Sequence, residues 1–114
     1  MTSCAVTNVN RKLGLWSAEL MYTAQIDKIL VLPNKWAVDT DSYGHFKVET
    51  RTFNSEPWSV CKGEYSMQGP YNPHEVVCDI STIARYIRLS EASGHGLYLT
   101  DVKVLGRPID QGTS

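Results

Sequence analysis

The side chains best suited to bind a ligand lie in three stretches of this chain, at residues 33–43, 63–73 and 91–96. They include aromatic rings, which offer flat apolar faces to the C–H groups of a sugar or anchor a protein interface. They also include carboxylates, a lysine and histidines, which form directional hydrogen bonds. We therefore predict a binding surface built from these stretches. Its candidate residues are Lys35, Trp36, Asp39, Asp41, Tyr43, Tyr65, Tyr71 and His95, with His74 beside them.

A structural interpretation of the aromatic residues stays open. In this interpretation, the side chains of Trp36 and Tyr43 fold back and cover the edge of the β-sandwich rather than contact a ligand. Tyr65 and Tyr71 lie close to proline or glycine residues. For these two tyrosines, packing within their own loop is the favoured interpretation.

Catalytic chemistry has little support in the sequence. His45, His74 and His95 are enough in number to hold zinc, but their spacing matches no metal-binding motif. The chain has no Gly-x-Ser-x-Gly segment and no glycine-rich phosphate loop. Cys61 would need a free, exposed thiolate beside a histidine to act as a nucleophile. We therefore predict that the chain is not an enzyme.

The elements that must position these residues are predicted to be β-strands, because apolar and polar residues alternate with a period of two. In the segment 84–90, Tyr86, Arg88 and Ser90 face one way and the intervening residues face the other. Short strands with turn residues between them predict an antiparallel sandwich or barrel. No helix is expected, and residues 1–14 are expected to form an irregular arm. The predicted strands are 15–21, 24–32, 45–53, 58–62, 75–80, 84–90 and 97–106.

The three candidate stretches are predicted to meet at one end of this sandwich. Successive antiparallel strands run in opposite directions, so the loops after the second, fourth and sixth strands emerge together. Those loops are the long or glycine-rich ones, whereas the connections at the other end are tight. Scaffolds that carry binding on loops show this asymmetry.

Size and charge narrow the class of protein further. The chain has 114 residues, which suits one domain with one core, and a formal net charge of −1. That charge does not indicate the basic surface that a nucleic-acid-binding protein needs. No apolar run approaches the ~20 residues that a membrane helix needs. The first residues do not resemble a signal peptide, so the chain is either intracellular or a mature domain, and we favour the second.

The cysteines leave two interpretations open. Cys61 and Cys78 fall on neighbouring predicted strands, which can bring two cysteines within disulfide reach. The alternative is two buried free thiols in an intracellular protein. Cys4 is the odd cysteine, either free or paired outside this chain.

Two segments near the C-terminus resemble a known group of domains. "ARYIRL" at 84–89 followed by "LYLTDVKVLG" at 97–106 is similar to the last strands of the discoidin-like domains, nearest to F-type lectins (fucolectins) and coagulation-factor C-type domains. The segment 15–21 resembles an earlier strand of the group through Trp16, Glu19 and Leu20. The resemblance covers 15–106.

The resemblance implies an all-β, antiparallel jelly-roll sandwich of the galactose-binding-domain-like type over 15–106, with an arm at 1–14 and a tail at 107–114. It implies an extracellular module, secreted or on the cell surface, that binds glycans or a cell-surface protein in adhesion. It also favours a Cys61–Cys78 disulfide. The alternative function is a protein–protein interaction domain of the same fold that has lost sugar binding. An intracellular adaptor with reduced cysteines is a third interpretation.

The sequence departs from the group at its known ligand sites. The fucose-binding arginines of F-type lectins have no counterpart here, although Lys35 lies near one of their places. The calcium that the group implies would need about six to eight oxygen ligands, and Asp101 is the single candidate carried over. Trp36 beside Lys35 resembles the apolar spike of a membrane-binding loop, which we rank below glycan or protein binding. The sequence predicts no oligomeric state.

Overall fold

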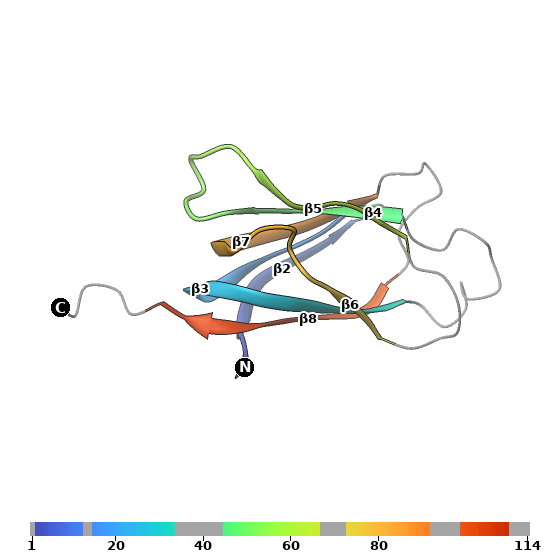
Figure 1. Cartoon of the computed structure of the whole chain (residues 1–114), viewed down its shortest axis with the longest axis horizontal. Coiled ribbons are helices and arrows are strands. Elements are labelled where there is room, and N and C mark those ends of the chain that lie inside the picture. The colour runs from blue at the N-terminus through green and yellow to red at the C-terminus, as the bar shows by residue number, and fades with distance from the viewer. Residues whose placement is uncertain (1, 13–14, 34–44, 67–72, 92–98, 110–114) are drawn as a thin grey trace.

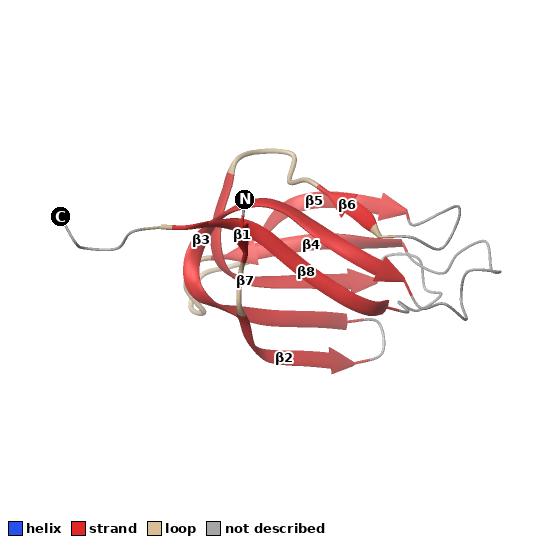
Figure 2. Cartoon of the chain, turned by 90° about the horizontal axis from the view of Figure 1, so that it is seen from below, coloured by secondary structure: helices blue, strands red, loops and turns tan. Residues whose placement is uncertain are grey.

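The computed structural model describes residues 2–12, 15–33, 45–66, 73–91 and 99–109. Strands joined by loops make up this described part, and it contains no helix (Figure 2). Consequently, none of it is a helix that could cross a membrane. The strands are β1 (Thr2–Ser3), β2 (Val6–Lys12), β3 (Leu15–Pro33), β4 (His45–Arg51), β5 (Ser59–Ser66), β6 (His74–Val76), β7 (Thr82–Glu91) and β8 (Leu99–Pro108).

The strands form one hydrogen-bonded antiparallel sheet that folds into two layers. The larger layer has the order β2-β3-β7-β4-β5, and the smaller layer has the order β1-β8-β3-β6. Figure 1 shows β4, β5 and β7 above, with β8 and the C-terminal part of β3 below. The predicted all-β antiparallel fold is therefore confirmed.

Strand β3 belongs to both layers. Its N-terminal part pairs with β7 along Leu15–Glu19 and again at Ala24–Ile26, and its C-terminal part pairs with β8 along Ala24–Pro33. Its pairing with β7 shifts register between Glu19 and Ala24. Such irregularities bend a strand and let it pass from one layer to the next. The sequence predicted two strands here, and the structure corrects this to one strand of 19 residues.

The core lies between the layers and follows the alternation in the sequence. Ile87 and Leu89 of β7 are completely buried, whereas the alternate residues Tyr86 and Arg88 are half-buried on the outer face. The inward residues of the other strands complete one continuous core: Trp16, Ala18, Leu20, Ile29, Val31, Phe46, Val48, Val102 and Val104, among others.

Four further strand predictions differ from the structure. Residues 2–12 form β1 and β2 instead of an irregular arm. Strand β5 continues past Gly63 to Ser66, because Gly63 lies at a register shift between β4 and β5 rather than at a strand end. Strand β6 is only three residues long, so Cys78 follows it and is not inside it. Strand β8 also runs two residues beyond the expected boundary at 106.

Candidate functional site

The strand ends that border the three candidate stretches lie at one end of the sandwich. In the larger layer His45 pairs with Ser66, and Phe46 pairs with Glu91. In the smaller layer Val31 pairs with His74, and Pro33 pairs with Leu99. These ends appear together at the right of Figure 1, and we call this part of the molecule the loop end. The predicted convergence is confirmed for the strands that border the stretches.

Most of the candidate binding residues lie outside the described residues, so their roles stay predictions. Of the residues that the sequence suggested as ligand or metal contacts, the structure describes Tyr65, His45, His74 and Asp101. The undescribed ones are Lys35, Trp36, Asp39, Asp41, Tyr43, Tyr71 and His95.

Tyr65 and His74 connect the two layers at the loop end. Tyr65 is on β5 of the larger layer, and its hydroxyl lies 3.1 Å from Nδ1 of His74 on β6 of the smaller layer. The two rings meet edge to face with their centroids 5.8 Å apart. The tyrosine ring also lies 5.5 Å from the ring of the buried Phe46. Tyr65 is therefore a strand residue that packs between the layers, in agreement with the packing interpretation of this side chain.

The environment of His74 favours its neutral form. Burial lowers the pKa of the imidazole, since the charged form loses solvation. Its Nε2 atom is buried and has no hydrogen-bond partner among the described residues. An imidazole in this position supports the structure best when it is uncharged.

Acidification is expected to destabilise the protein through His74. The unfolded chain takes up a proton on this residue near its ordinary pKa of about 6.5, whereas the folded chain does so only at lower pH. This contribution to stability is therefore complete above about pH 6.5 and is lost as the pH falls below it. Urea unfolding at pH 7.5 and at pH 5.5 should show a smaller loss of stability in His74→Asn than in the wild type. Equal losses in the two proteins would contradict this assignment.

His45 connects β4 and β5. Its Nε2 lies 3.1 Å from the Ser66 hydroxyl, and its Nδ1 lies 3.4 Å from a carboxylate oxygen of Glu64. No group of three histidine, cysteine or acidic side chains that could hold a metal occurs in the described parts of the chain. Asp101 is half-buried on β8 with Lys103 two residues further along the strand. The described residues alone therefore do not make a calcium site around Asp101.

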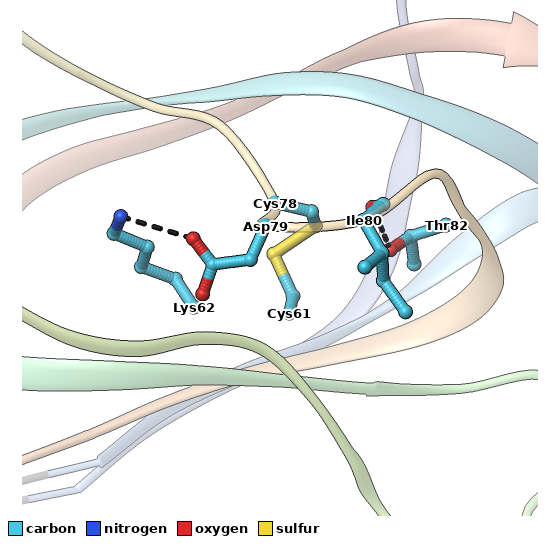
Figure 3. Close-up of a disulfide and its surroundings, with 6 residues drawn as sticks. All are labelled: Cys61, Lys62, Cys78, Asp79, Ile80 and Thr82. Carbon is cyan, nitrogen blue, oxygen red and sulfur yellow. Dashed lines mark hydrogen bonds and ion pairs between the residues drawn. A yellow bond between two sulfur atoms is a disulfide. The ribbon is translucent and has the colours of Figure 1, made fainter.

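Cys61 and Cys78 form a disulfide across the edge of the sandwich, as the resemblance implied. Cys61 is on β5 of the larger layer, and Cys78 follows β6 of the smaller layer (Figure 3). The Asp79 amide donates to the Cys61 carbonyl over 2.7 Å, and the Asp79 carboxylate pairs with Lys62 at 3.1 Å. The disulfide also removes Cys61 as a nucleophile.

Cys4 is the free cysteine of the chain. Burial raises the pKa of its thiol, and the nearby Asp27 raises it further. The thiol is therefore mainly protonated at neutral pH, and a protonated thiol reacts slowly.

The outer face of the larger layer carries a cluster that sequence reasoning missed. The guanidinium carbons of Arg51 and Arg88 lie 4.2 and 4.4 Å from the ring centre of Trp58. Arg88 also pairs with the buried Glu49 at 2.8 Å. These contacts shield the ion pair from water. The alternation in β4 and β7 could have placed the charged residues on one face, but Trp58 precedes β5 and follows no such pattern.

Comparisons with known proteins add information on the fold. No family model matches the chain, and no curated protein matches it in sequence. Among solved structures, the C-terminal domain of a chitobiase from Bacteroides fragilis aligns with a TM-score of 0.69 and 15% identity, covering 89% of this chain and 68% of that one. An F5/8 type C domain of the same organism aligns with a TM-score of 0.65 and 8% identity, covering 83% and 66%.

A third structure is a family 32 carbohydrate-binding module of Clostridium perfringens in complex with galactose. It aligns with a TM-score of 0.60 and 13% identity, covering 79% of this chain and 64% of that one. The chain has the β-sandwich fold of these domains. The expected discoidin-like fold is confirmed, and the nearer likeness to F-type lectins stays a prediction.

Proposed function

We propose that this chain is a non-catalytic module that recognises carbohydrate at the loop end. The observation that carries the proposal is the convergence of the strand ends that border all three candidate stretches. Those stretches contribute aromatic rings and hydrogen-bonding groups, which is the composition of a sugar-binding surface. The similar solved domains support it, because one was solved with galactose and another with a disaccharide of N-acetylgalactosamine and galactose.

We also propose an extracellular setting, either secreted or on a cell surface, in which the module contributes to adhesion. The Cys61–Cys78 disulfide supports this setting, since disulfides persist in oxidising compartments and are rare in the cytosol. Thiol titration of the denatured protein provides a direct test. One free thiol per chain is expected, and three would support an intracellular protein.

Glycan binding is expected to depend on Trp36. The wild-type protein should bind galactose- or N-acetylgalactosamine-terminated glycans on an array, and Trp36→Ala should weaken that binding about tenfold or more by removing a stacking surface. Tyr22→Ala is the matched control, since Tyr22 is 61% exposed and lies in the bend of β3, away from the loop end. Equal binding by both variants would remove Trp36 from the site.

The same array should be run with calcium and with a chelator. Binding that disappears with the chelator would assign a calcium ion to the undescribed stretches. A blank array from protein shown to be folded would overturn the carbohydrate proposal.

A protein–protein function is the second candidate, and one observation favours it. Several large apolar side chains are exposed near the end opposite to the loop end, among them Ile80 at 70% and Phe53 at 65%. They flank a cavity of about 190 Å³ between the 52–56 turn and the 80–83 segment. Exposed apolar clusters often mark protein interfaces. This function becomes the leading one if the array is blank.

A further inference from the structure

The outer face of the smaller layer carries a small cavity close to the loop end. It has a volume of about 130 Å³ and is lined by Leu30, Leu32, Pro73, Asp101 and Lys103. Strand register places these side chains on one face, because Leu32 pairs with Asp101 and Leu30 pairs with Lys103. The cavity therefore lies across β3 and β8, with Pro73 beside it just before β6.

The cavity has an apolar floor on the solvent side of the sheet. The neighbouring β3 residues Ile29 and Val31 point into the core and are completely buried. Leu30 and Leu32 alternate with them, so they point outward, where they remain half-buried. The apolar run of β3 thus supplies the core with one set of side chains and the cavity with the other.

The two charged residues of the cavity have no ionic partner in the part of the chain that the structure describes. Neither Asp101 nor Lys103 has an ion pair or hydrogen bond within the described ranges of the chain. Lys28 and Glu75, on the same outer face, pair with each other instead. The cavity therefore offers one carboxylate and one ammonium group that no other described residue engages.

We propose that this cavity binds one sugar unit of a neutral glycan through a pair of neighbouring hydroxyl groups. A carboxylate accepts hydrogen bonds and an ammonium group donates them, whereas each sugar hydroxyl does both. Asp101 thus accepts from one hydroxyl, Lys103 donates to the next, and the leucines and Pro73 contact the C–H face of the ring. Asp101 and Lys103 carry opposite charges that balance, so the cavity gives a charged sugar no net electrostatic attraction.

The size of the cavity agrees with this assignment. Sites for drug-sized ligands occupy about 300–1,000 Å³, so a cavity of about 130 Å³ accommodates part of one sugar ring. The inference rests on the proposed carbohydrate function and deepens it, since it places sugar contacts on the sheet face beside the loop end. It also assigns Asp101 a role that needs no metal ion.

Titration of the isotope-labelled protein with methyl β-galactoside and its N-acetylgalactosamine counterpart tests the inference. Amide shifts are expected at Leu30–Leu32 and Asp101–Lys103, and Asp101→Asn should raise the dissociation constant about tenfold, because it weakens a charge-assisted hydrogen bond. Glu75→Gln is the matched control, since it removes a carboxylate from the same face outside the cavity. It should leave the dissociation constant unchanged, and a chelator should have no effect on the wild type.

Two results would overturn the inference and leave the proposed function intact. The first is saturable sugar binding with shifts elsewhere and no effect of Asp101→Asn. The second is loss of the amide shifts at Leu30–Leu32 and Asp101–Lys103 when the chelator is added, because Asp101 would then act through a cation. If neither sugar binds here and the glycan array is also blank, the proposed function fails and the inference with it.

Discussion

Loss of the Cys61–Cys78 disulfide is expected to lower the free energy of unfolding by about 3 kcal/mol. The bond joins residues 17 positions apart, and closing a loop of that length removes this much conformational entropy from the unfolded chain. It also holds the residues after β6 against β5, where a backbone hydrogen bond from Asp79 to Cys61 is the one that the described residues form outside the strand pairs. The short strand β6 depends on this attachment more than the longer strands do.

The measurement is urea unfolding of the wild type and of the double variant Cys61→Ala, Cys78→Ala. A change of this size corresponds to a shift in melting temperature on the order of 10 °C for a domain of this length. Cys4→Ser is the control, because it removes a thiol without breaking a cross-link. A double variant no less stable than the control would show that the disulfide adds nothing to the fold.

The fold was largely predictable because its strands follow a period of two. The alternation in 84–90 correctly separated the buried Ile87 and Leu89 from the outward Tyr86 and Arg88. The strand prediction failed where the backbone pairs as a strand although the side chains do not alternate between apolar and polar. Strand β2 lies at an edge and has a register shift between Thr7 and Asn10, so its residues do not alternate.

The candidate site was predictable only at the level of loop direction. Successive antiparallel strands alternate in direction, so every second loop emerges at the same end of the sandwich. This convergence can be predicted from the order of the strands along the sequence, without knowing any contact between them. The Tyr65–His74 contact depends on which strands face each other across the two layers. No local pattern determines that arrangement, and the same is true of the cavity formed by Leu30, Leu32, Asp101 and Lys103.

Substitution Gly106→Ala is expected to destabilise the protein by about 3 kcal/mol, at the upper end of the range for overpacking. Gly106 lies on β8 between β1 and β3, where it pairs with Thr2 and Ile26. A Cβ atom at this position would lie 2.2 Å from the Gln25 carbonyl oxygen and 3.3 Å from the Ile26 Cα. Both are backbone atoms, so no side-chain rotation relieves the contact, and β8 must move away from β3.

Gly63→Ala provides the matched control for this prediction. Gly63 is also a strand glycine, on β5, but a Cβ atom there would have no other heavy atom within 4 Å. Alanine at position 63 should be neutral, or stabilising by up to about 1 kcal/mol through the lower entropy of the unfolded chain. Urea unfolding of both variants separates the effect of backbone proximity from the general effect of replacing glycine. Equal stabilities would mean that β8 and β3 do not approach as closely at Gly106 as the structure places them.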